Sequence, residues 1–190
     1  AAKKSGRVAA EGLVAISVDE TRGAIIELNA ETDFVARNGE FQKFASSLAT
    51  LAMSVSDLST LKETEVPGSG RNVADEITHK IATIGENMSL RRMETVSVNQ
   101  GAVISYMHNS IATDLGRIGV LVGITSTVSR EKLEPLGKQL AMHIAATSPL
   151  SLSIDDLDPT IIEREREVLI EQAKSSGKPA EIAEKMVEGR

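Results

Sequence analysis

The sequence predicts an α+β protein built from two related lobes, in which antiparallel strands pack with helices, followed by a protruding C-terminal helical hairpin. Short strand-like runs occur in pairs, and a segment with helical spacing of apolar residues follows each pair. The run Arg22–Ile26 resembles Arg117–Leu121, so the same plan occurs twice along the chain. Duplicated hairpin-then-helix units are typical of two related lobes.

The first lobe, expected over residues 1–88, opens with two strands at 13–18 and 23–28 that are joined by a turn at 19–22. A helical period begins near Glu40. Its apolar positions are Phe41, Phe44, Ala45, Leu48, Leu51, Ala52 and Val55. After a Pro-Gly loop at 67–70, a second helix carries a stripe of Val73, Ile77, Ile81 and Ile84, and Gly85 is placed to end it.

The second lobe, expected over 89–158, starts with a strand at 90–98. Strands at 102–106 and 118–122 then form a hairpin across a longer connection. A helix follows with the stripe Leu133, Leu136, Leu140, Ala141 and Ile144.

The last part, 159–190, is predicted to be a helical hairpin, broken at 176–179. Thr160 and Glu163 have the spacing of a capping box. The acidic residues Asp155, Asp156 and Asp158 precede this helix, and we interpret them as capping residues rather than metal ligands.

Composition argues against several classes of function. The net charge is −6, with three Phe, one Tyr and no Trp, which suits neither phosphate tracking nor base stacking, so we expect no direct nucleic-acid partner. The chain contains no cysteine and no apolar run near the ~20 residues that cross a bilayer, which predicts a soluble, cytoplasmic protein without membrane contact.

Residues for chemistry are scattered. The three histidines, His79, His108 and His143, lie far apart in the sequence and lack zinc-ligand spacing. The Ser176–Pro179 run is not a phosphate loop, because Pro179 stands where such a loop needs a hydroxyl. We therefore expect no cofactor, no metal and no chemical active site.

The most informative stretch is Glu31–Asn38, between a buried strand and a helix. One interpretation is that Thr32 or Asp33 caps a helix while Phe34 folds back into the core. The other is that Phe34 is functional, because strand-to-helix connections lie at the surface and often carry function. The second lobe, which reads Thr125-Ser126-Thr127-Val128, has no counterpart of Asp33-Phe34, and this favours a special role for the pair.

Thr32–Asn38, following the Ile25–Asn29 strand, resembles the signature of the translation elongation factor Ts family. Further stretches match in family order over nearly the whole chain, namely 1–12, 80–87 with Arg91 and Arg92, 105–108, 117–122, 176–179 and 186–190. Compared with typical family members, the chain resembles a central core fragment that lacks the N-terminal helical domain and the C-terminal end. The resemblance implies that the hairpin at 159–190 is a protruding, truncated antiparallel coiled coil.

The resemblance implies a guanine-nucleotide exchange factor for elongation factor Tu, acting on its GDP-bound and nucleotide-free forms. Asp33 and Phe34 would enter the partner's G domain and disrupt its Mg²⁺ site, while Thr32 and Val35 shape the turn. The resemblance also makes Ile84 and His108 partner contacts, although Ile84 could equally be a core residue.

Two other functions stay open. The chain could be an interaction module of the same fold without exchange activity, which burial of Asp33-Phe34 would favour. An enzyme with a dispersed active site is the other, and a pocket of clustered groups would favour it. Family precedent also allows a homodimer through the core.

Overall fold

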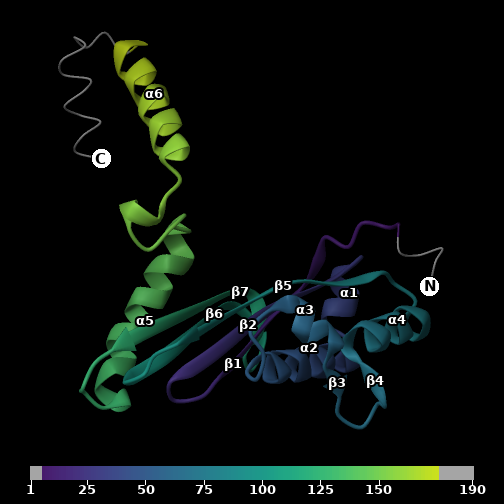
Figure 1. Ribbon diagram of the computed structural model, residues 1–190. Helices are drawn as coiled ribbons and strands as arrows, with labels where there is room; N and C mark the ends of the chain where they lie inside the picture. The colour runs from purple at the N-terminus through teal and green to yellow at the C-terminus, as the bar shows by residue number, and fades with distance from the viewer. Residues whose placement is uncertain (1–5, 176–190) are drawn as a thin grey trace. The chain divides into compact units, whose positions relative to one another are not determined.

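The computed structural model describes residues 6–175, and its mixed helices and antiparallel strands confirm the predicted α+β class (Figure 1). The chain divides into two compact units, Ala1–Thr147 and Ser148–Arg190. The three-part division expected from the sequence stays a prediction.

The larger unit is built on a five-stranded antiparallel sheet with the order β5-β2-β1-β7-β6. Its strands are β1 (Glu11–Val18), β2 (Arg22–Ala30), β5 (Met88–Ser97), β6 (Gly101–Ala112) and β7 (Leu115–Thr125). The hairpins β1–β2 and β6–β7 were both predicted, and β1 pairs with β7, so that strands of the two expected lobes share one sheet.

Helices of the first half cover one face of β1 and β2 (Figure 1). They are α1 (Asp33–Ala36), α2 (Gly39–Ala52), α3 (Leu58–Glu63) and α4 (Val73–Ile84). Between α3 and α4 lies a small hairpin of β3 (Glu65–Val66) and β4 (Arg71–Asn72). The alternate strand residues Leu13, Ala15, Ala24, Ile26 and Leu28 meet Phe41, Phe44 and Leu48 of α2 in the main core. This is the period-two and period-3.6 pattern that the sequence predicted.

Helix α4 ends as the sequence predicted. Gly85 adopts the left-handed conformation with φ 96°, and its N–H donates to the carbonyl of Ile81. A residue with a Cβ is disfavoured at this φ, and glycine is the usual solution at a helix C-terminus. The chain is thereby turned from α4 toward Glu86 and the start of β5.

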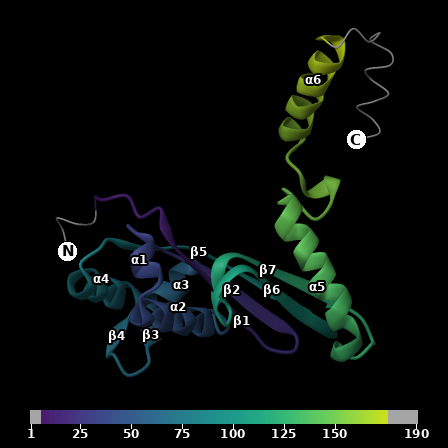
Figure 2. The same ribbon diagram turned by 180° about the vertical axis from the view of Figure 1, so that it is seen from behind.

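Two details of the second half differ from the prediction. Strands β6 and β7 extend to Ala112 and Leu115, so a tight turn replaces the expected longer connection. Helix α5 (Arg130–Thr147) packs on β6 and β7 through Leu133, Gly137 and Ala141, whereas Leu136 and Leu140 of the predicted stripe are exposed (Figure 2). The seam is shifted because Gly137 permits a closer approach than a larger residue would.

The smaller unit contains a 3₁₀ turn, η1 (Ile154–Asp156), and helix α6 (Pro159–Ser175). The Asp156 carboxylate accepts hydrogen bonds from Ser153, which confirms a capping role for it. At α6 the Asp158 carboxylate accepts the Thr160 N–H at 2.9 Å, so Asp158 and not the predicted Thr160 provides the cap. The second helix of the predicted hairpin lies outside the described residues.

The α5–β6 contact yields a stability prediction. A Cβ at position 137 would lie 2.5 Å from Cγ1 and 2.8 Å from Cβ of Ile104, and that Cβ cannot move without shifting β6. We expect Gly137→Ala to lower the free energy of unfolding by about 1–2 kcal/mol, because overpacking outweighs the gain in helix propensity of about 1 kcal/mol. Urea unfolding followed by circular dichroism measures it.

Gly39→Ala is the matched control, since Gly39 begins α2 and a Cβ there would meet nothing within 4 Å. We expect it to leave stability within about 0.5 kcal/mol. Equal stability of both variants would show that the α5 seam tolerates a methyl group.

Candidate functional site

Helix α1 presents Phe34 to solvent. The helix is a single turn that begins directly after β2, with Thr32 as its extended N-cap residue. Val35 and Ala36 point into the main core and are buried, whereas the Phe34 side chain is 79% exposed. Successive helical residues point about 100° apart, so burying the second half of the turn leaves Phe34 on its outer side. Phe34 therefore does not fold back into the core, and the first interpretation of this stretch is wrong for that residue.

Carboxylates hold the start of this turn against the segment after α4. The Glu86 carboxylate accepts the N–H of Thr32 at 3.0 Å and its hydroxyl at 2.6 Å. In the opposite direction, the Glu31 carboxylate accepts the N–H of Asn87 at 2.6 Å. Arg7 forms an ion pair with the Glu31 carboxylate at 3.5 Å, and the backbone carbonyl of Arg7 accepts a hydrogen bond from the Asn87 side chain. Hydrogen bonds to charged acceptors are roughly twice as strong as neutral ones.

Asp33 remains accessible beside Phe34. Its carboxylate pairs with Arg37 one turn later, at 3.3 Å, and both side chains are solvent-exposed. Such surface pairs contribute little to stability. The true cap of the following helix is Asn38, whose side chain accepts the N–H groups of Glu40 and Phe41. Asp33 is thus free to exchange Arg37 for another partner at small cost.

The remaining predicted site residues lie on other elements. Ile84 is the last residue of α4 and is half-buried against the main core, so the structure supports its core role in part. His108 is exposed on β6, and its Nδ1 lies 3.1 Å from the hydroxyl of Tyr106. Their rings are 6.1 Å apart.

A surface hollow of about 420 Å³ joins α1 to the β6–β7 hairpin. Its lining residues are Asp33, Ala36, Arg37, Asn109, Ile111 and Arg117. His108 directly precedes Asn109, so the hairpin that carries His108 also borders the turn that carries Phe34. The hollow thereby brings Asp33, from the first half of the sequence, beside the hairpin of the second half.

The roles of Glu31, Glu86 and Ile111 were not predicted from the sequence. The two glutamates act across more than fifty residues of chain, and no local pattern reports such a contact. Ile111 could have been found if the predicted strand had been extended beyond Tyr106. The residues there are polar and their alternation is irregular, so the signal is weak.

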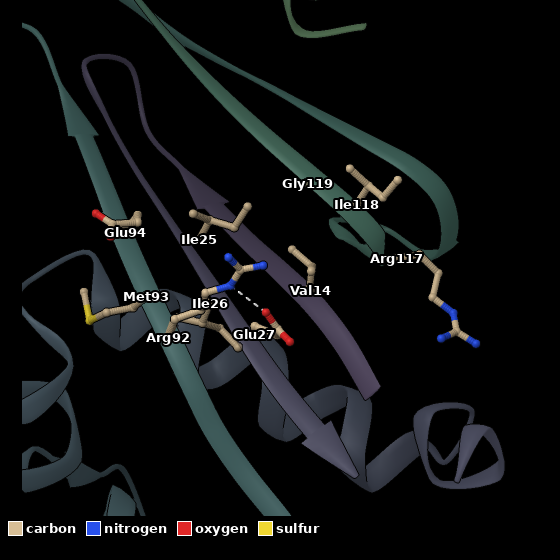
Figure 3. Close-up of a pocket in the computed structure, with 10 residues that line it drawn as sticks. All are labelled: Val14, Ile25, Ile26, Glu27, Arg92, Met93, Glu94, Arg117, Ile118 and Gly119. Carbon is tan, nitrogen blue, oxygen red and sulfur yellow. Dashed lines mark hydrogen bonds and ion pairs between the residues drawn. The ribbon is translucent and has the colours of Figure 1, made fainter. Parts of the chain in front are cut away.

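A second hollow lies on the sheet face opposite α2 (Figure 3). The apolar side chains of Val14, Ile25 and Ile118 line it, and the Glu27–Arg92 ion pair lies beside them (Figure 3). A β-bulge between Glu27 and Leu28 disturbs the register there, and the two consecutive arginines Arg91 and Arg92 both reach Glu27, at 3.2 and 2.6 Å.

The ion cluster of Glu27, Arg91 and Arg92 lowers the pKa of Glu27. Burial raises the pKa of Glu27, but hydrogen bonds from Arg92, Asn29 and Arg91 and the Arg92 charge outweigh it, so the pKa lies below its ordinary value of 4.5. The cluster binds Glu27 in its charged form, which is a structural role and offers no general acid or base.

Within residues 6–175, no group of three histidine, aspartate or glutamate side chains is arranged to hold a metal ion. His79 and His143 are exposed, on α4 and α5 respectively. In the same part of the chain, no helix is both long and apolar enough to cross a membrane.

The family model described as Elongation factor TS matches residues 31–190. The chain belongs to the elongation factor Ts family. Curated relatives named elongation factor Ts come from Rhodospirillum centenum, at 56% identity over 191 residues, and Rickettsia bellii, at 51% over 191 residues. Each of these alignments covers 100% of this chain and 62% of the relative, so the chain spans about 62% of the length of those proteins.

Because Phe34 of this elongation factor Ts family chain is exposed, its side chain should contribute little to the stability of the fold. We expect Phe34→Ala to change the free energy of unfolding by less than about 0.5 kcal/mol, because the side chain leaves little apolar contact behind. Phe41→Ala is the matched control: Phe41 is 0% exposed in the core, and its loss should cost about 3–5 kcal/mol. Urea denaturation of the three proteins measures both values. A loss above 2 kcal/mol for Phe34→Ala would mean that Phe34 packs against the protein in solution.

The Glu27 cluster predicts a pH dependence. Because the folded pKa is lowered, the contribution of Glu27 is fully present above the unfolded pKa near 4.5 and is lost as the pH falls through the folded pKa. We expect Glu27→Gln to be about 1 kcal/mol less stable than the parent at pH 7. The difference should stay constant down to pH ~5 and shrink below it.

Urea unfolding at pH 7, 5, 4 and 3 tests this dependence, with Glu94→Gln, an exposed position on β5, as the control. A difference that grows on acidification would contradict the assignment of a lowered pKa.

Proposed function

We propose that this chain is a guanine-nucleotide exchange factor for elongation factor Tu and that it works by inserting Phe34 and Asp33 into the partner's G domain. The observation that carries the proposal is an aromatic side chain that is 79% exposed on an anchored turn of a chain in this family. Aromatic residues, Phe among them, are enriched at protein–protein interfaces relative to the rest of the surface. The named relatives support a role in translation elongation.

Exchange of this kind requires no chemical active site. A factor that binds the nucleotide-free partner more tightly than the GDP-bound partner must, by linkage, weaken GDP binding to the same extent. In the proposed mechanism the Phe34 ring enters as a wedge, and the elements that hold Mg²⁺ are displaced. GDP then loses the counter-charge on its phosphates and dissociates.

The surface around Phe34 supplies the other contacts. Val35 is buried and Thr32 is bonded to Glu86, so these two residues shape the turn, and Asp33 reaches the partner beside the ring. Ile84 and the exposed His108 extend the proposed interface on either side. Burial of the half-exposed Ile84 and of Phe34 would contribute apolar area, at roughly 1.5–3 kcal/mol for a fully buried side chain.

The principal alternative is a docking module without exchange activity. Burial of Asp33-Phe34 was the observation that would have favoured it, and Phe34 is exposed instead. Its remaining support is the length of the chain, which spans 62% of the relatives above. The experiment below separates the two functions.

The test is stopped-flow release of fluorescent GDP from elongation factor Tu. We expect the parent chain to accelerate release and Phe34→Ala to be roughly 30-fold slower, since a hot spot worth about 2 kcal/mol corresponds to that factor at ~1.4 kcal/mol per decade. Val128→Ala is the matched control, because Val128 is also exposed, at 44%, but lies in the connection between β7 and α5. It should release GDP like the parent.

Two other results have distinct meanings. Equal rates for the parent and Phe34→Ala would remove Phe34 from the mechanism while keeping exchange. Binding of elongation factor Tu without faster GDP release by the parent would replace the proposal with the docking module.

A further inference from the structure

Thr32 stands at the N-cap position of α1, yet its side chain makes no capping hydrogen bond to that helix. The hydroxyl instead donates to the Glu86 carboxylate at 2.6 Å, and the Thr32 N–H donates to the other oxygen of the same carboxylate at 3.0 Å. Thr32 is thereby bonded to a distant segment and not to its own helix. Departures from a local rule of this kind concentrate at functional sites.

We propose that Glu86 is a positioning residue for Phe34: its carboxylate fixes the backbone of Thr32 and so sets the direction in which the aromatic ring projects. This inference rests on the proposed exchange function. Glu86 does not touch the partner in this mechanism, and its effect reaches the partner through Phe34.

The geometry of the contact suits such a role. Both carboxylate oxygens of Glu86 accept hydrogen bonds, one from the backbone N–H and one from the hydroxyl of Thr32. Rotation of Thr32 relative to Glu86 therefore breaks at least one of the two bonds. A reciprocal hydrogen bond, from the Asn87 N–H to the Glu31 carboxylate at 2.6 Å, also links the start of the turn to the segment after α4. Charge-assisted bonds at two neighbouring residues therefore oppose both sliding and twisting of the turn.

The same bonds connect two proposed contact residues. Glu86 directly follows Gly85, whose left-handed φ of 96° ends α4 after Ile84. The turn with Phe34 and the end of α4 with Ile84 are consequently held as one body by Glu86. A partner surface would then meet both side chains at a fixed spacing.

Phe34 needs this support because it has little packing of its own. With 79% of the side chain exposed, only the backbone on either side holds it, through buried Val35 after it and Thr32 before it. If the Thr32 side is released, the turn samples other conformations, and only a fraction of molecules present the ring correctly. The effective strength of insertion falls by that fraction.

The first test follows the turn without any partner. The chain contains no tryptophan, so Phe34→Trp introduces a single tryptophan at the position in question. In this background we expect Glu86→Gln, and likewise Thr32→Val, to lower the time-resolved fluorescence anisotropy of Trp on the nanosecond scale. Thr32→Ser keeps the hydroxyl and should keep the anisotropy.

Glu94→Gln is the matched control, because it makes the same change of charge at an exposed position on β5. Urea unfolding of every variant accompanies the anisotropy, since a merely structural role for Glu86 would lower stability and leave the motion of Trp in the folded state unchanged. Unchanged anisotropy in both Glu86→Gln and Thr32→Val overturns the proposal.

The second test measures exchange in the native Phe34 background at increasing concentrations of the factor. We expect Glu86→Gln and Thr32→Val to lower the maximal rate of GDP release roughly tenfold, as for loss of a hydrogen bond to a charged group. The concentration for half-maximal rate should change less than about threefold, because the rest of the interface is intact. Thr32→Ser, which keeps the hydroxyl, should recover most of the rate that Thr32→Val loses, and Glu94→Gln should match the parent.

Failure of the two proposals is distinguishable. If the parent does not accelerate GDP release, the proposed function fails, and the anisotropy alone then decides whether Glu86 orders the turn. If the parent accelerates release and Glu86→Gln does so equally well, the function stands and the positioning role of Glu86 is overturned.

Discussion

Close approach of the β6–β7 hairpin to the β1–β2 hairpin is the constraint on which the arrangement of the site depends. Strand β1 bonds to β2 along its length but to β7 only near Val14 and Ala15. Beyond that point β7 crosses the face of the sheet opposite α2, and a Cβ at Gly119 would lie 2.7 Å from Ile25 and 2.8 Å from Val14. A side chain there would push the hairpin away, and the hollow shared by α1 and Asn109–Ile111 would open.

In the turn that carries Phe34, the residues that anchor the turn differ from the side chain that it exposes. Residues on either side of Phe34 along the chain are secured by two different means, burial for Val35 and charge-assisted hydrogen bonds for Thr32. An apolar anchor alone would leave the turn free to rotate about it, since dispersion and hydrophobic contacts carry little direction. The hydrogen bonds supply the direction, and the exposed ring contributes almost nothing to folding.

Much of the fold could be predicted because local periodicity reports it. The hairpin β1–β2, helix α2 and the end of α4 at Gly85 follow from alternation, helical spacing and one glycine. The seam of α5 was mispredicted because glycine does not count as apolar in such a pattern, although Gly137 is the residue that packs on Ile104. The pairing of β1 with β7 and the bonds of Glu86 join residues far apart in the chain, and no local pattern encodes them. The residues alone left burial and exposure of Phe34 both open, because most aromatics are buried whereas strand-to-helix connections lie at the surface. The missing counterpart in the second copy and the family resemblance favoured a functional role.

The duplication in the chain shows what distinguishes the two copies physically. After β7 the second copy closes its turn locally, where the Ser126 hydroxyl accepts the Val128 N–H at 3.1 Å. After β2 the first copy uses no such local bond at Thr32, and its turn is closed by Glu86 from outside the repeated unit. Distant backbone also holds this second turn, because the Ser126 N–H donates to the Gln100 carbonyl at 3.2 Å and Arg130 donates to the carbonyls of Asp19 and Glu20. The two turns therefore differ in which parts of the protein they are bonded to. The turn with Phe34 is fixed relative to α4. The proposed insertion would require this, because a ring on a turn that is free to move would be displaced when it meets the partner.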